Sequence, residues 1–188
     1  MKTLSIDGRT IEIRAFERGD VVAVGQFAAA LPIHDLLFLS RDIQHARVIE
    51  AWQQAISDGE IESLVAIDGD TVVGTSAIVR DPLSWSAHVA ELRLLVAPSM
   101  RGHGLGRIML DASIKIASER GAIKLIAHMT PDQKGAIALF EESGFRGEAM
   151  LRDHVRDREG NVFDLAILSL DLRRSGALRQ SWGFDSQQ

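Results

Sequence analysis

The amino-acid sequence predicts a mixed α/β (α+β) fold, in which a largely antiparallel sheet carries helices on both faces and contains one central βαβ unit. Two turn motifs, Asp68-Gly69-Asp70 and Gly160-Asn161, each separate two β-type runs and are typical of hairpins. Residues 88–126 alone have the strand, helix, strand order of a right-handed parallel crossover. Because the other strand connections are hairpins, we expect a mixed sheet rather than a doubly wound one.

The first expected elements are two strands and a helix. Residues 10–16 alternate apolar and polar side chains, as a half-buried strand does, and a short turn would pair them with residues 2–6. Asp20 belongs to the residue types that cap helices at their start, and Pro32 cannot continue a helix. A helix is therefore expected from Asp20 to about Ala30.

A second helix is expected from Ser40 to Ser57. Ser40 is a suitable N-cap, and Asp58-Gly59 provides a stop. Apolar side chains at helical spacing give this helix one buried face: Ile43, Val48, Trp52 and Ile56. Strands at residues 63–67 and 71–79 follow, on either side of the first hairpin turn.

The second half of the chain alternates strands and helices before a final hairpin. Gly121 and Gly144 are placed to end two helices. The expected elements, in chain order, are a strand at 88–96, a helix at 105–120, a strand at 123–128, a helix at 133–143, and antiparallel strands at 148–155 and 162–170. Residues 1–172 are thus expected to form one domain. Residues 173–188 are expected to form a polar C-terminal tail, docked at most through Trp182 and Phe184.

The composition is that of an ordinary globular protein. With 188 residues, 46% of them hydrophobic and 25% charged, the chain can bury one sizeable core. No apolar run reaches the roughly 20 residues of a membrane span, and the N-terminus lacks a signal-peptide core, so we expect a cytoplasmic protein without a membrane partner. The absence of cysteine excludes disulfides, thiolate metal sites and a cysteine nucleophile. The scattered histidines do not have the spacing of metal ligands, so no metal is expected. The net charge of −5 disfavours a nucleic-acid partner.

The most informative segment joins the strand at 88–96 to the helix at 105–120 and reads Arg101-Gly102-His103-Gly104-Leu105-Gly106. The start of a helix carries unpaired N–H groups and a partial positive charge, and glycines allow phosphates to approach them closely. The spacing is not the Gly-x-Gly-x-x-Gly of dinucleotide-binding loops, and no Gly-Lys-Ser/Thr follows. A phosphate-bearing ligand of another kind is therefore expected.

The same segment fits the pattern Arg/Gln-x-x-Gly-x-Gly/Ala, with Leu94, Val96 and Pro98 before it and Gly144-Phe145 further on. Over residues 14–172 the chain resembles the Gcn5-related N-acetyltransferases, the GNAT superfamily. The resemblance implies acetyl-CoA as cosubstrate, with its pantetheine arm on the strand and its pyrophosphate on the glycine loop. The cofactor-binding residues that it implies are Leu94, Leu95, Val96, Arg101, Gly102, His103, Gly104, Leu105, Gly106, Gln133 and Phe140.

Two residues depart from the family pattern Asn-x-x-Ala-x-x-Leu-Tyr. Gln133 stands where the family has asparagine and can still form hydrogen bonds. Phe140 stands where many relatives have the tyrosine that protonates the leaving thiolate, and the chain contains no tyrosine at all. Water, another side chain or unassisted departure must serve instead, and a thiol with a pKa near 8.5 tolerates the last of these.

Acyl transfer also requires an acceptor amine that has lost its proton. Glu91 is the first candidate base, because its apolar neighbours on the strand would raise its pKa and several relatives use a glutamate on this strand. Glu91 could instead pair with Arg93. His128, at the end of the next strand, is the second candidate, although the pattern fits a buried structural histidine better. The resemblance also assigns the N–H of Val96 as the oxyanion donor.

The predicted function is acetylation of an amine by direct transfer from acetyl-CoA in a ternary complex, where positioning supplies much of the rate. The alternative is a non-catalytic acyl-CoA-binding sensor or regulatory module. The acceptor, a small-molecule or peptide amine, would contact segments that correspond here to residues 27–47 and 151–164. Acidic residues in these segments would suit a cationic amine: Asp35, Asp42, Asp153 and Asp157. A homodimer, frequent in the family, is possible.

Overall fold

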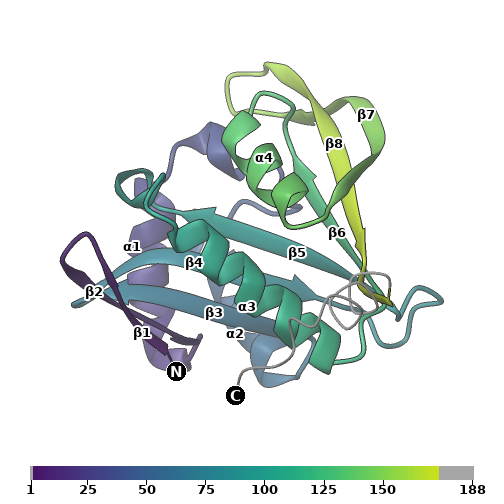
Figure 1. Cartoon of the computed structure of the whole chain (residues 1–188). Helices are drawn as coiled ribbons and strands as arrows, with labels where there is room; N and C mark the ends of the chain where they lie inside the picture. Colours follow the sequence, from purple (N-terminus) through teal and green to yellow (C-terminus); the bar gives the residue numbers. More distant parts are fainter. Residues whose placement is uncertain (1, 174–188) are drawn as a thin grey trace.

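The structure, a computed structural model, describes residues 2–173, so residues 174–188 of the expected tail, Trp182 and Phe184 included, lie outside the described part. Within that part, eight strands form one sheet in the order β1-β2-β3-β4-β5-β6-β8-β7 (Figure 1). The pair β5 and β6 is parallel, and all other neighbouring pairs are antiparallel. The strands are β1 (Lys2–Ile6), β2 (Arg9–Ala15), β3 (Ile61–Asp68), β4 (Thr71–Val79), β5 (Val89–Val96), β6 (Lys124–Met129), β7 (Arg146–Arg156) and β8 (Val162–Asp171). The predicted mixed, largely antiparallel fold is confirmed.

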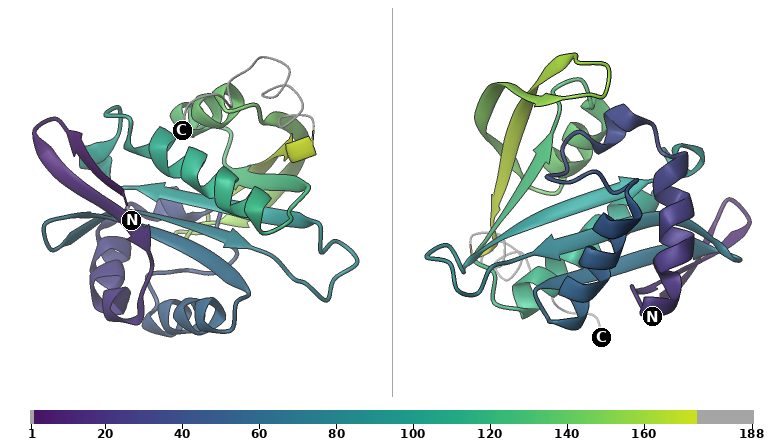
Figure 2. Two further views of the ribbon diagram at one scale, coloured as in Figure 1. Left: turned by 60° about the horizontal axis from the view of Figure 1, so that its bottom comes forward. Right: turned by 180° about the vertical axis from the view of Figure 1, so that it is seen from behind.

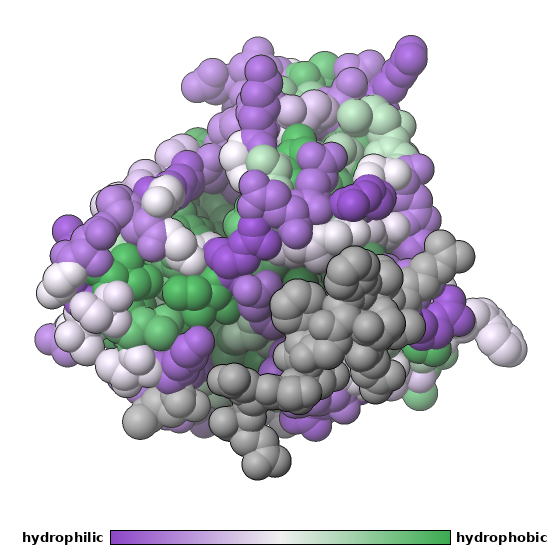
Figure 3. All heavy atoms as spheres, in the orientation of Figure 1, coloured by the Kyte–Doolittle hydropathy of each residue, from purple (hydrophilic) through white to green (hydrophobic). Residues whose placement is uncertain are grey.

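Helices cover both faces of the sheet, as Figure 2 shows. Helices α1 (Val21–Ala30) and α2 (Ala46–Ser57) lie on one face, and α3 (Leu105–Glu119) and α4 (Lys134–Glu142) lie on the other. Three 3-10 turns connect these elements: η1 (Arg18–Asp20), η2 (Ile33–Leu36) and η3 (Pro98–Met100). Seen from the α3 and α4 side, the surface is mainly polar, with an apolar area beside the β1–β2 hairpin (Figure 3).

The hydrophobic core is split by the sheet into two layers. Under α3 and α4, Leu92, Leu125 and Phe145 are almost completely buried with their neighbours. Under α1 and α2, Val24 and Val65 are completely buried in a second cluster. Burial on both faces stabilises the sheet. Truncating one large side chain in such a core costs about 2 to 5 kcal/mol of unfolding free energy.

Strands β5 and β6 pair only at their first residues and then diverge (Figure 1). Glu91 opposite Ile126 is the last pair in their register. On its other side β5 remains paired with β4 as far as Val96, which lies opposite Gly74. In the described part of the chain, the second half of β5 therefore has one edge without a neighbouring strand. We call the space between the diverging halves of β5 and β6 the wedge.

Helix α2 begins five residues later than the sequence predicted, at Ala46 rather than directly after Ser40. The reason is that Gln44, in the segment before Ala46, is used to hold the end of α1. The side chain of Gln44 donates from Nε2 to the carbonyl oxygens of Ala28 and Leu31, at 3.0 and 3.1 Å. Asp42 Oδ1 accepts the backbone N–H of Gln44 at 3.0 Å, in a local turn that competes with helix formation. The sequence also gave no indication of η2, and the other predicted elements are present with boundaries shifted by up to a few residues.

Candidate active site

The glycine loop ends in an uncapped helix start. Gly102 and Gly104 have φ angles of +79° and +85°, in the left-handed region that favours glycine. A Cβ atom built on either residue meets no other atom within 4 Å, so both face open space. Gly104 is the N-cap of α3, and no side chain caps the helix there or places an acidic group in its first turn. The first amides of α3 thus form a positive, accessible cradle for an anion.

Gly106 serves close packing rather than open space. A Cβ atom there would lie 3.2 Å from Leu139 Cδ2 and 3.7 Å from Val96 Cγ2. The glycine therefore lets α3 approach both α4 and β5 at the mouth of the wedge. Leu105, beside it, is completely buried and anchors the helix start in the core. Both residues position the cradle, and only their backbone groups are available to a ligand.

Arg101 and His103 are engaged with other parts of the chain. Arg101 donates from Nη2 to Asp35 Oδ2 of η2 at 2.6 Å and from Nε to the carbonyl of Val96 at 3.2 Å. His103 Nδ1 contacts the carboxylate of Asp7 in the β1–β2 turn. Arg101 thus reaches across to both η2 and β5, and its contact with Asp35 would have to break before it could bind a phosphate.

The open edge of β5 presents the backbone of Leu94 and Val96 to the wedge. Ala97 N donates to Val73 O at 2.9 Å, so Ala97 faces β4. Peptide groups alternate sides along an antiparallel strand, and those of Val96 and Leu94 therefore point away from β4. An extended ligand in the wedge can bind this edge as an added strand would. Leu95, between them, turns its buried side chain toward the α1 and α2 face.

Gln133 and Phe140 have local partners in this structure. Gln133 precedes α4, and its Oε1 accepts the backbone N–H of Thr130 at 3.2 Å. Phe140 is buried in the core, with its ring edge to face against Phe145 at a centroid distance of 4.9 Å. Phe140 therefore has a packing role here, and its contact with a cofactor stays a prediction.

Glu91, Arg93 and His128 form one cluster at the point where β5 and β6 separate. Arg93 holds Glu91 in a two-pronged contact, with Nε to Oε1 at 2.7 Å and Nη2 to Oε2 at 2.8 Å. His128 Nδ1 lies 3.4 Å from Glu91 Oε1. The side chains of Glu91 and His128 are only 18% and 22% exposed, so both are largely shielded from solvent.

The charge state of Glu91 differs from the prediction. Burial alone raises the pKa of its carboxyl, but the hydrogen bonds from His128 and Arg93 and the charge of Arg93 outweigh burial and lower the pKa to about 2. The expectation of a raised pKa was wrong, because the hydrogen bonds and charges of Arg93 and His128 outweigh the effect of burial among apolar neighbours. Pairing with Arg93, the alternative from the sequence, is what the structure contains. Glu91 is therefore ionised at neutral pH and is held between Arg93 and His128.

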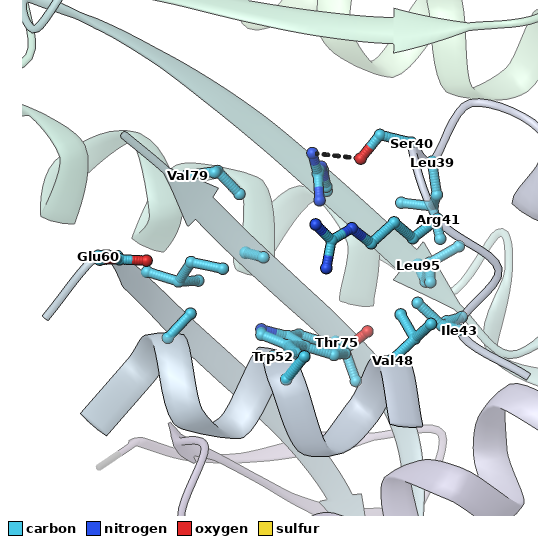
Figure 4. A pocket seen from close by; sticks show the side chains of 15 residues that line it. Leu39, Ser40, Arg41, Ile43, Val48, Trp52, Glu60, Thr75, Val79 and Leu95 are labelled. Atoms are coloured by element: carbon cyan, nitrogen blue, oxygen red, sulfur yellow. Dashed lines mark hydrogen bonds between the residues drawn. The ribbon is translucent and has the colours of Figure 1, made fainter. Parts of the chain in front are cut away.

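A cavity of about 350 Å³ lies between α2, the segment before it and the sheet (Figure 4). Its walls are mostly apolar, and Arg93 and Leu95 of β5 contribute to them. Arg41 and Trp52 also line it. The indole Nε1 of Trp52 is buried and has no hydrogen-bond partner among the described residues. The sequence predicted burial of Trp52 on the face of its helix, but no pattern in the sequence indicated a cavity beside it.

The described residues contain no group of three or more histidine, aspartate or glutamate side chains placed to hold a metal ion. None of the helices in residues 2–173 combines the length and the apolar character needed to cross a membrane.

Comparison with known proteins identifies the family. Residues 30–145, more than half of the chain, match the model of the acetyltransferase (GNAT) family. The chain therefore belongs to the GNAT family, as the glycine loop and its flanking elements indicated. The matched range contains the whole of the cradle, the open edge of β5 and the cluster of Glu91, Arg93 and His128.

Two curated relatives match parts of the chain. YwnH of Bacillus subtilis (strain 168), provisionally named a phosphinothricin acetyltransferase, is 31% identical over 83 residues, which cover 44% of this chain and 50% of that protein. N-acetyltransferase 8 of Rattus norvegicus is 26% identical over 111 residues, which cover 57% of this chain and 50% of that protein. The chain thus spans about half the length of the curated relatives it matches.

Solved structures share the fold over most of the chain. An N-acetyltransferase from Staphylococcus aureus Mu50 superposes with a TM-score of 0.75 at 20% identity, over 86% of this chain and 98% of the other. Spermidine N-acetyltransferase from Vibrio cholerae, solved with CoA and spermine, superposes with a TM-score of 0.71 at 19% identity, over 86% of this chain and 95% of the other. At these identities the likeness is one of fold.

Proposed function

We propose that this protein is an N-acetyltransferase that transfers the acetyl group of acetyl-CoA directly to an amine. The observation that carries the proposal is the uncapped start of α3, with two left-handed glycines in open space beside the unpaired edge of β5. Family membership supports it. The same fold holds acetyl-CoA in a Salmonella typhimurium protein and CoA in the Vibrio cholerae enzyme.

The residues present fit acetyl-CoA. The amides at the start of α3 suit a pyrophosphate, because they combine unpaired N–H donors with the positive end of the helix dipole. The backbone groups of Leu94 and Val96 suit the amide-containing pantetheine arm, which can pair with an open strand edge. Arg101 adds a positive charge at the same end of the wedge once it is released from Asp35.

The reaction forms a bond between the amine nitrogen and the acetyl carbonyl carbon, and it breaks the bond between that carbon and sulfur. The amine must give up one proton, and the departing thiolate must gain one or remain ionised. We assign His128 as the proton acceptor and Glu91 as the residue that positions its ring, since Glu91 is a fixed anion 3.4 Å away. The backbone N–H of Val96 points into the wedge and is assigned to the carbonyl oxygen.

The thiolate leaves without a tyrosine acid, because none exists in the chain. A thiol with a pKa of about 8.5 is a tolerable leaving group near neutral pH. Bringing amine and thioester together in one complex supplies much of the rate, which lets the site function with incomplete acid catalysis. A homodimer and a cytoplasmic location are further parts of the proposal, and either can be checked by ultracentrifugation and cell fractionation.

The proposal is tested by measuring CoA release from acetyl-CoA with a broad amine panel, alongside calorimetric titration of CoA into the protein. Saturable CoA binding together with amine-dependent release supports the transferase. CoA binding without release on any amine favours the alternative, a sensor or regulatory module. Absence of CoA binding contradicts both.

A further inference from the structure

Strand β5 lines the cavity under α2 and also carries the open edge on which we propose that the cofactor binds. Leu95 and Arg93 line the cavity, while the backbone of Leu94 and Val96 faces the wedge. Only strand β5 therefore separates a molecule in the cavity from the position where the thioester is expected. Its apolar walls, which include Ile43, Val48 and Ala77, suit a hydrocarbon group.

The polar groups that the cavity offers are chiefly donors. Trp52 Nε1–H has no partner among the described residues, but it is too enclosed for a ligand oxygen in the cavity to reach it in this structure. Arg41 extends its guanidinium group over the cavity (Figure 4) and forms no hydrogen bond or ion pair with any residue of the described range. Arg93, by contrast, is already neutralised by Glu91 and also donates to Ser40 at 3.2 Å. Arg41, an exposed side chain on the cavity wall, is thus a cation without a hydrogen-bond or ion-pair partner in the described part of the chain.

Acidic groups that could hold a cationic acceptor are scarce around the cavity. Among the described residues that line it, Glu60 is the only acid, and it is exposed. Two of the acids that the sequence offered for a cationic amine are paired with arginine, Asp35 with Arg101 and Asp42 with Arg158. The lining thus matches an anion joined to an apolar body better than it matches a polyamine.

We propose that the cavity binds the carboxylate and the apolar side chain of an α-amino-acid acceptor, and that Arg41 is the residue that selects for the carboxylate. This inference rests on the proposed transferase function and names its substrate class. The carboxylate receives charge-assisted hydrogen bonds from Arg41, while the apolar walls hold the side chain. The α-amino group, next to the carboxylate, is left to face β5 and the thioester.

The test compares matched pairs of acceptors that differ only in the carboxylate. CoA release is measured with valine, leucine, methionine and phenylalanine, and with the four amines that remain when each loses its carboxyl group. Spermidine is included as the cationic comparison. Because hydrogen bonds to charged groups contribute 10- to 100-fold in affinity, kcat/KM for an amino acid should exceed that for its decarboxylated amine by about that factor. Spermidine should be turned over more poorly than the amino acids.

Variants separate the cavity from the rest of the site. Arg41→Gln should lower kcat/KM for the amino acids by about 10- to 100-fold and change that for the decarboxylated amines by no more than about twofold. Arg18→Gln, at an exposed arginine of η1 that does not line the cavity, is the matched control and should keep the preference.

The outcomes distinguish the two proposals. Turnover of decarboxylated amines or spermidine as fast as the amino acids overturns the cavity assignment and leaves the transferase standing. A carboxylate preference that survives Arg41→Gln also overturns it. If no acceptor releases CoA, the transferase fails, and calorimetric titration of the four amino acids into CoA-loaded protein then decides the cavity: binding that Arg41→Gln abolishes supports it, and absence of binding contradicts it.

Discussion

The carboxylate of Glu91 lies 3.4 Å from Nδ1 of His128, across the point where β5 and β6 stop pairing. The two residues come from neighbouring parallel strands. Glu91 of β5 lies opposite Ile126 of β6, and His128 is two residues further along β6. Arg93 holds the carboxylate from the other side. Glu91 is therefore fixed in place and ionised, and His128 is oriented at the base of the wedge.

The first prediction separates the proton acceptor from the residue that positions it. His128→Gln should lower kcat/KM for an active amine by about 100- to 1000-fold, a range consistent with loss of general base catalysis, without changing CoA affinity. Glu91→Gln should have a smaller effect and should change the pH profile of kcat/KM. His88→Gln, at an exposed histidine just before β5, is the control. A His128 variant with full activity at every pH would remove it from the mechanism.

The second prediction concerns stability and pH. The pKa of Glu91 is lowered from 4.5 to about 2 on folding, so its stabilising contribution is present above the unfolded value and is lost as the pH falls from 4.5 toward 2. The unfolding free energy of the wild type should exceed that of Glu91→Gln by about 2 to 3 kcal/mol near pH 7. Denaturant titrations at several pH values should show this difference shrinking below pH 4.5.

A control for that experiment is Glu50→Gln, an exposed change on α2. It should alter the unfolding free energy by less than about 0.5 kcal/mol at all pH values. A difference between wild type and Glu91→Gln that stays constant down to pH 3 would show that the carboxylate is not held by Arg93 and His128 in solution.

Much of the fold follows from local sequence. The turn Asp68-Gly69-Asp70 and the glycine loop were enough to predict a hairpin and the strand-to-helix connection. The start of α2 was not predictable, because Gln44 is used for a tertiary contact with the end of α1 that no local pattern indicates. Tertiary partners override local propensity in such segments.

The site was predictable to a similar extent. The cradle follows from glycine spacing and the start of a helix, which are local features. The low pKa of Glu91 was within reach, since Arg93 is two residues along the strand and so on the same face. The contact with His128 depends on the register of β5 against β6, and the cavity beside Trp52 depends on how completely α2 packs on the sheet. Neither is encoded in a short stretch of sequence.

The third prediction tests the cradle. Gly104→Val forces a branched side chain into a left-handed conformation and fills the open space above the first amides of α3. CoA affinity should fall by about tenfold or more, measured by calorimetry on folded protein. Gly160→Val is the matched control, because Gly160 also has a positive φ and open space but lies in the β7–β8 turn. It should lose a similar amount of stability and keep its CoA affinity.

The fourth prediction concerns the competition for Arg101. In this structure the guanidinium binds Asp35 at 2.6 Å, and a pyrophosphate would compete for it. Asp35→Asn should therefore strengthen CoA binding by a few-fold, while Arg101→Gln should weaken it by about tenfold at low ionic strength. The effect of Arg101→Gln should decrease as salt is added. Equal CoA affinities for wild type, Asp35→Asn and Arg101→Gln would place Arg101 outside the cofactor site.

The most direct test of the central claim is a crystal structure of the protein with CoA bound. The account predicts that the pyrophosphate oxygens accept hydrogen bonds at about 3 Å from the backbone amides of Gly104, Leu105 and Gly106, with the pantetheine arm along Leu94 and Val96 in the wedge. CoA bound at any other place, or a wedge closed by side chains with Arg101 still on Asp35 and Val96, would contradict it.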